Sequence, residues 1–86
     1  MTPESLDTVR RLAVETLKLP EAAVAQARTL RDAGIDSLAA IDLIVAIESH
    51  YGISIAAQDV ENIQSLNDLA LSVDRLTGNE ARRYDA

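Results

Sequence analysis

Residues 32–52, DAGIDSLAAIDLIVAIESHYG, form an amphipathic helix pattern with more apolar positions than one buried face requires. At about 100° per residue, one side of such a helix collects five residues that we predict to face the core. These are Ala40, Leu43, Ile44, Ile47 and Tyr51. The opposite side carries Leu38, Ile41 and Val45 at spacings of three and four. This second stripe is therefore either covered by another part of the chain or exposed to a partner.

Capping and breaking residues divide the chain into helices. Thr2 and Pro3 are typical of a helix start. Gly52 and Gly78 are typical of helix ends. Ser65 begins a sequence that resembles a capping box. We predict longer helices over about residues 3–18, 37–51 and 66–77, and a short helical turn near residues 58–62. The predicted buried stripes of the first and last helices are Leu6, Val9, Ala13, Leu17, Leu66, Leu69, Val73 and Leu76.

The fold class that these segments predict is all-α: a small four-helix bundle of three longer helices and one short helix. Residues 20–35 read as a long loop between the first two helices, with Leu30 and Ile35 as anchors into the core. Residues 53–55 are interpreted as an extended link. We expect one domain over residues 1–78 and a flexible tail over residues 79–86.

Composition excludes several classes of function. The 86 residues include no cysteine, so thiolate metal sites and a cysteine nucleophile are excluded, and one histidine among scattered acids gives no metal-ligand spacing. The net charge of −6 disfavours nucleic acid and anionic membranes as partners. From Asp32 to Asp74 there are eight acids and no Lys or Arg, which indicates either a solvated surface or a docking surface for basic partners. The first residues lack the basic start and apolar run that are typical of a signal peptide, and no stretch is long enough to span a bilayer, so we expect a cytoplasmic protein.

Ser37 lies where the second helix is predicted to begin. Most Asp-Ser pairs before an apolar run do no more than cap a helix, and Asp36 or Ser37 would serve here. The same position also suits a phosphate ester, because a helix N-terminus carries unpaired N–H groups and partial positive charge. A hydrolase is disfavoured: His50 is more than three turns from Ser37 on the same helix, and no nucleophile-elbow motif is present.

Gly34-Ile35-Asp36-Ser37-Leu38 resembles the signature of the acyl carrier proteins and the related peptidyl carrier domains. The resemblance extends over roughly residues 5–77, including the long first loop and the short third helix. It implies a non-catalytic carrier in which Ser37 bears 4′-phosphopantetheine, derived from coenzyme A, with the cargo held on it as a thioester. The prosthetic group would then supply the reactive sulfur that the chain lacks.

The resemblance also assigns the partners. A phosphopantetheinyl transferase would modify Ser37, and acyl- or aminoacyl-loading ligases or transferases and later biosynthetic enzymes would dock on the second helix of a monomeric carrier. The positions that match the family's docking surface are Asp36, Leu38, Ile41, Asp42, Val45 and Glu48.

Departures from the fatty-acid carriers favour a specialised pathway, with a polyketide, siderophore, modified lipid or aminoacyl cargo. Ala39 stands where an acid is common, Ser49 and His50 interrupt the usual acidic run, and Arg28 and Arg31 lie in a loop where acids are common. The alternatives are a peptidyl carrier, the housekeeping fatty-acid carrier, and a helical interaction module that is never modified.

Overall fold

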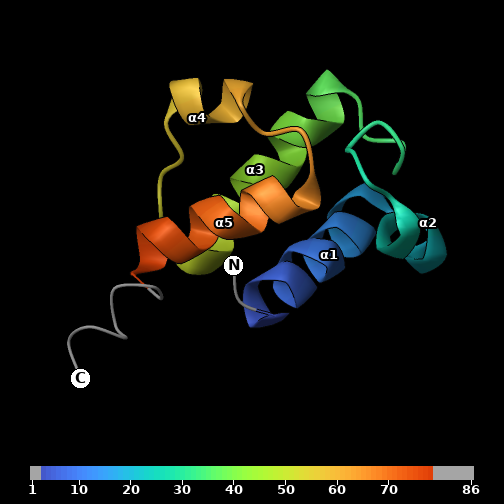
Figure 1. Cartoon of the computed structure of the whole chain (residues 1–86), viewed down its shortest axis with the longest axis horizontal. Helices are drawn as coiled ribbons and strands as arrows, with labels where there is room; N and C mark the ends of the chain where they lie inside the picture. The colour runs from blue at the N-terminus through green and yellow to red at the C-terminus, as the bar shows by residue number, and fades with distance from the viewer. Residues whose placement is uncertain (1–2, 79–86) are drawn as a thin grey trace.

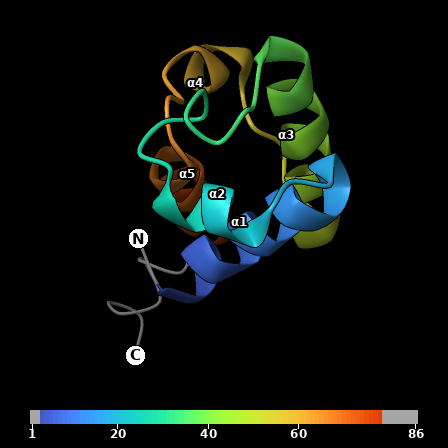
Figure 2. The same cartoon turned by 90° about the vertical axis from the view of Figure 1, so that its right-hand side faces the viewer.

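The computed structural model describes residues 3–78. Over this range the chain forms five helices and no strand: α1 (Pro3–Leu17), α2 (Glu21–Gln26), α3 (Ser37–Tyr51), α4 (Ala57–Glu61) and α5 (Leu66–Thr77). The three longer helices pack together, with α1 in contact with both α3 and α5 (Figure 1). Seen from the side, the segment between α2 and α3 and the short α4 lie across the bundle from α1 (Figure 2). The predicted all-α bundle of three longer helices is confirmed.

The prediction of an irregular loop over residues 20–35 is wrong at its start, where α2 forms. Pro20 supplies the extended N-cap backbone, and the alanine-rich run that follows has high helix propensity. Val24 is 2% exposed, so tertiary burial adds to this local preference. Six residues are too few to show a helical period, which is why the pattern did not reveal α2. The irregular segment therefore covers only residues 27–36.

Capping groups place the ends of α3 as predicted. The Asp36 carboxylate accepts a hydrogen bond from Ala39 N at 2.8 Å, and this satisfies one of the free N–H groups of the first turn. Gly52 adopts a left-handed conformation (φ 67°), and its N–H donates to the carbonyl of Glu48 at 2.8 Å.

The capping box before α5 is confirmed in part. Ser65 accepts a hydrogen bond from Asp68 N, but the Asp68 carboxylate accepts from Gln64 N at 2.9 Å rather than from Ser65 N. Two other predictions, the N-cap at Thr2 and the tail over residues 79–86, lie outside the described residues.

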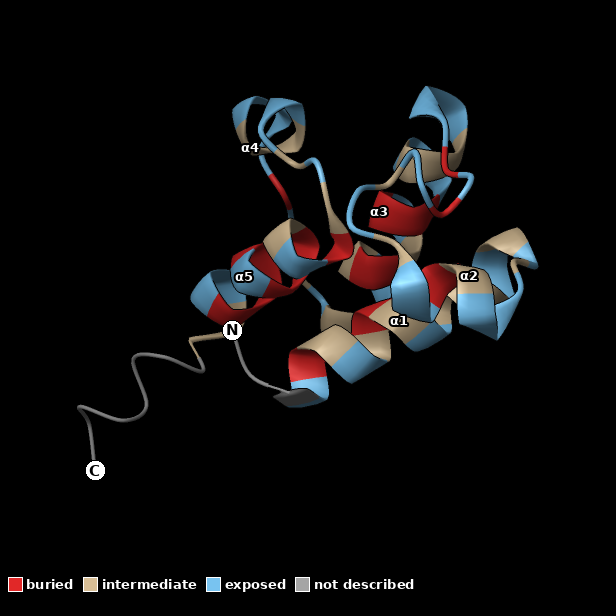
Figure 3. Ribbon diagram, turned by 45° about the vertical axis from the view of Figure 1, so that its right-hand side comes forward, coloured by how far each residue is buried: buried red, intermediate tan, exposed pale blue. Residues whose placement is uncertain are grey.

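Buried apolar residues of α1, α3 and α5, together with a few from α2 and the irregular segments, form the core. Its buried apolar members are Val9, Ala13, Val24, Ala33, Ile35, Leu43, Ile44, Ile47, Ile55, Leu66, Leu69, Ala70 and Val73. Figure 3 marks the buried positions along the ribbon in red. Leu6 and Leu17 are partly buried, as are Ala40 and Tyr51. The prediction that Leu76 is buried is wrong, because it is 43% exposed. The contact between Ser5 and Asp74 places the start of α1 beside residue 74, so little of α1 remains to cover Leu76.

One carboxylate lies inside the core. Asp74 is fully buried, and the hydroxyl of Ser5, itself 3% exposed, donates a hydrogen bond to its Oδ1. Asp74 therefore does not belong to the acidic surface that the sequence suggested. A buried carboxylate is tolerated only when it is hydrogen-bonded, so this contact ties α1 to α5 across the chain.

Replacing Asp74 with alanine is expected to lower the free energy of unfolding by about 1–3 kcal/mol, because the buried hydrogen bond that the Ser5 hydroxyl donates to the Asp74 carboxylate is lost. Urea unfolding followed by circular dichroism measures the change. Asp7→Ala, which removes an exposed carboxylate from α1, should stay within about 0.5 kcal/mol of wild type. Equal unfolding midpoints for the two variants would contradict a stabilising role for the buried pair.

Candidate functional site

Ser37 is the first residue of α3, and its side chain is exposed. Asp36 is the residue that caps the helix: its carboxylate accepts from Ala39 N, and its carbonyl accepts from Ala40 N at 2.8 Å. Within residues 3–78 the Ser37 hydroxyl has no hydrogen-bond partner. Capping therefore occupies Asp36 and leaves the Ser37 hydroxyl exposed.

The segment before α3 is tightly anchored, which fixes the position of Ser37. Ile35 is 4% exposed, and its N–H donates to the carbonyl of Leu30 at 2.9 Å. Leu30 N in turn donates to the carbonyl of Gln64 at 2.9 Å, which joins this segment to the link between α4 and α5. Gly34 makes the turn between them at φ 84°, a conformation that residues with a Cβ rarely adopt. The predicted anchors Leu30 and Ile35 are confirmed, with Leu30 partly buried.

A hollow of about 470 Å³ lies directly against Ser37. It is lined by Arg31, Gly34, Ile35, Asp36 and Ser37. The hollow is open to solvent and combines polar and apolar surface, so it provides room for a group attached at Ser37.

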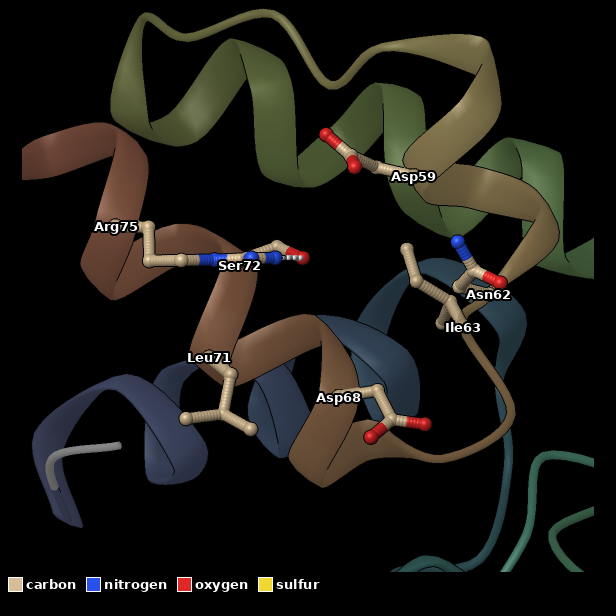
Figure 4. Close-up of a pocket in the computed structure, with 7 residues that line it drawn as sticks. All are labelled: Asp59, Asn62, Ile63, Asp68, Leu71, Ser72 and Arg75. Atoms are coloured by element: carbon tan, nitrogen blue, oxygen red, sulfur yellow. Dashed lines mark hydrogen bonds between the residues drawn. The ribbon is translucent and has the colours of Figure 1, made fainter.

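A second hollow, of about 430 Å³, lies between α4 and α5 (Figure 4). Asp59 of α4 and Asp68 and Arg75 of α5 bring both signs of charge to it. Its one hydroxyl, that of Ser72, is buried and accepts a hydrogen bond from Arg75 at 3.2 Å. It offers no exposed nucleophile, and the site at Ser37 remains the stronger candidate.

The outer stripe of α3 is uncovered. Leu38 is 76% exposed, Ile41 54% and Val45 53%, so neither the loop nor another described helix shields them. Asp42 beside them is exposed as well. Three large aliphatic side chains in one row on a small protein are typical of a surface that meets a partner.

Glu48 differs from the other residues predicted for this surface. Its side chain is partly buried, and its Oε2 accepts a hydrogen bond from Ile55 N at 2.8 Å. The carboxylate thus secures the link that follows α3. Its charge is less available to a partner than that of Asp42.

The described residues give no support to metal or hydrolytic chemistry. His50 is exposed in the last turn of α3, with its ring edge-on to Tyr51, while Ser37 is in the first turn. Residues 3–78 contain no group of three side chains that could hold a metal ion. In the same range no helix has the length and apolar character needed to cross a membrane.

Arg31 is the lining residue that sequence reasoning did not place at the site. In the sequence it is only a cation in a loop where acids are common. The backbone turn at Gly34, which brings residue 31 beside residue 37, was the available signal.

Comparison of the sequence with known proteins identifies a family. A family profile described as "Phosphopantetheine attachment site" matches residues 7–73. The chain is 31% identical over 78 residues to an acyl carrier protein of Campylobacter hominis, an alignment that covers 90% of this chain and 99% of the relative. It is 31% identical over 71 residues to an acyl carrier protein of Campylobacter curvus, covering 81% and 92%. The chain therefore belongs to the phosphopantetheine attachment-site family of non-catalytic carrier proteins, as a distant homologue of the acyl carrier proteins.

Proposed function

We propose that this protein carries acyl groups on a 4′-phosphopantetheine arm attached to the hydroxyl of Ser37. The observation that carries the proposal is the environment of that hydroxyl. It is exposed at the first residue of α3, without a hydrogen-bond partner among the described residues, and it borders a hollow of about 470 Å³. The arm, once attached, supplies a thiol on which the cargo is held as a thioester.

The residues around Ser37 fit a phosphodiester at this point. A phosphate on the first residue of a helix lies near unpaired N–H groups and the positive end of the helix dipole. In the attachment step Ser37 Oγ forms a bond to the coenzyme A phosphorus that bears the pantetheine. The bond to adenosine 3′,5′-bisphosphate breaks, and the hydroxyl proton passes to a base. His50 is at the far end of α3, so that base belongs to the phosphopantetheinyl transferase.

Within this function we place the protein in a specialised biosynthetic pathway, in the cytoplasm and as a monomer. Ala39, Ser49 and His50 reduce the number of acidic side chains along α3. Arg31 adds a basic residue to the hollow at Ser37. Docking would then depend more on apolar contact than on charge. The partners we propose are the transferase, an acyl-loading ligase or transferase, and the enzymes that process the cargo.

The proposal is tested by intact-mass measurement after incubation with coenzyme A and a phosphopantetheinyl transferase of broad specificity. The expected result is complete conversion to a species heavier by one phosphopantetheine. An unchanged mass with a transferase that modifies a control carrier would overturn the assignment.

Docking through the outer stripe of α3 leads to a separate prediction. Val45→Asp is expected to lower kcat/KM for modification about tenfold or more, because it inserts a charge into an apolar contact. Val45 is 53% exposed, so the helical circular dichroism signal should stay unchanged. Leu76→Asp is the matched control, since Leu76 is 43% exposed but lies on α5.

The two possible failures of this prediction are distinct. Loss of helical signal in Val45→Asp would show that the stripe is part of the core. Equal kcat/KM values for Val45→Asp and Leu76→Asp, with both proteins folded, would show that partners dock elsewhere.

A further inference from the structure

Arg31 and Ser37 line the same hollow, and Arg31 is the one basic residue among the five that line it. Six positions separate the two residues in the chain, and the turn at Gly34 brings them to one site. Arg31 is therefore the basic residue in the lining of the hollow that borders the hydroxyl on which, by the function proposed above, a phosphodiester is formed.

The backbone of Arg31 is held by its neighbours. Its carbonyl accepts a hydrogen bond from Gly34 N at 2.9 Å, and the adjacent Leu30 carbonyl accepts from Ile35 N at 2.9 Å. Ala33 and Ile35, which follow it, are 3% and 4% exposed and anchor the turn in the core. The start of the Arg31 side chain is thus fixed relative to α3, and rotation about its own bonds determines where the guanidinium points.

The nearest acids in sequence are committed to other donors. One Asp32 carboxylate oxygen accepts from Arg28 N at 3.3 Å, and Asp32 lines a different hollow together with Arg28. The Asp36 carboxylate caps α3 through Ala39 N. Within residues 3–78 the Arg31 guanidinium has no ion pair and no hydrogen bond. It is therefore available to an anion that arrives at Ser37.

A phosphodiester offers this guanidinium a complementary partner. It carries a full negative charge at neutral pH, and its two non-bridging oxygens match the forked N–H donors of arginine. The helix adds donors of its own, because Asp36 satisfies the N–H groups of Ala39 and Ala40 and leaves those of Ser37 and Leu38 at the open end of α3.

We propose that Arg31 binds the phosphodiester attached to Ser37 and holds the root of the arm on the side of α3 that faces residues 31–36. This inference rests on the proposed attachment at Ser37 and adds a positioning residue to it. The phosphate end of the arm is then held in one orientation relative to α3 rather than rotating freely. Because the pair is exposed, its strength decreases as salt concentration rises.

The test compares unmodified and modified protein in four backgrounds: wild type, Arg31→Gln, Arg31→Lys and Arg28→Gln. Arg28→Gln is the matched control, because Arg28 is exposed in the same loop but does not line the hollow at Ser37. Thermal unfolding at low salt measures the shift in Tm on modification. Nitrogen-15 NMR follows the Nε–H signal of Arg31 in the wild-type protein before and after modification.

Modification is expected to raise the Tm of wild type and Arg28→Gln by roughly 2–4 °C relative to its effect on Arg31→Gln. Arg31→Lys should retain part of the shift, since it keeps the charge but loses the forked donors. Added salt should reduce the shift, and the Arg31 Nε–H signal should move on modification.

The outcomes separate this inference from the function on which it rests. If no variant gains mass with coenzyme A and transferase, the attachment itself is overturned. If modification occurs but shifts the Tm of wild type and Arg31→Gln equally, with the Arg31 signal unmoved, Arg31 does not bind the phosphate. Equal loss of the shift in Arg28→Gln would also overturn the inference, because it would reflect the charge of the loop rather than contact at the hollow.

Discussion

Ser37→Ala is expected to abolish the mass gain with coenzyme A and transferase completely, whereas Ser49→Ala should be modified at the wild-type rate. Both serines are exposed residues of α3, one in its first turn and one in its last. They differ in position and surroundings rather than in chemistry. The comparison therefore tests whether the start of the helix selects the modified hydroxyl.

The physical reason lies in what surrounds each hydroxyl. Ser37 is at the N-terminal end of the helix, where free N–H groups and the dipole stabilise a phosphate, and it borders the hollow. Ser49 is near the C-terminal end, where the dipole disfavours added negative charge. Removal of the Ser37 oxygen leaves no atom to form the phosphoester, so the expected loss is total rather than graded.

Tandem mass spectrometry of the modified wild type supplies the direct check and should place the added mass on the peptide that contains Ser37. A persistent mass gain in Ser37→Ala would show that another hydroxyl is the acceptor. Circular dichroism of Ser37→Ala should match wild type, because Asp36 rather than Ser37 caps α3.

The elements that could be predicted from the sequence are those with strong local signals. α3 has a capping aspartate at one end and a left-handed glycine at the other, so both of its predicted ends match the structure. Ser65 and Gly78 delimit α5 in the same way. Local capping chemistry acts within one turn of the helix, and for this reason a single sequence reveals it.

The features that were missed depend on tertiary contacts. α2 is short and is stabilised by the burial of Val24, which no local pattern reports. The sequence predicts a surface position for Asp74, because carboxylates are rarely buried, but the Ser5 hydroxyl that binds it comes from 69 residues away in the chain. Glu48 likewise accepts its hydrogen bond from Ile55, in the link that follows α3, and the fold brings Arg31 into the same hollow as Ser37.

The two faces of α3 illustrate this limit most directly. Helical periodicity separated the two apolar stripes correctly, but it could not establish which of them the rest of the chain covers. The structure buries Leu43, Ile44 and Ile47 and leaves Leu38, Ile41 and Val45 exposed. That the exposed stripe and Ser37 serve partners and a prosthetic group stays a prediction.

Two isoleucines on α3 allow the difference between its faces to be measured. Ile47→Ala is expected to lower the free energy of unfolding by about 2–5 kcal/mol, because Ile47 is fully buried and its truncation leaves a cavity. Ile41→Ala should change it by no more than about 0.5 kcal/mol, because Ile41 is 54% exposed. Urea unfolding with a common m-value measures both changes.

This pair is well controlled, since both variants remove the same carbon atoms from the interior of the same helix. The gain in helix propensity on replacing isoleucine with alanine is common to both and cancels in the comparison. What remains is the difference in burial between the two faces. If Ile41→Ala destabilised the fold as much as Ile47→Ala, the outer stripe would be packed in solution and unavailable for docking. If only Ile47→Ala does so, the fold does not need the outer stripe, and its three aliphatic side chains are free to serve a partner.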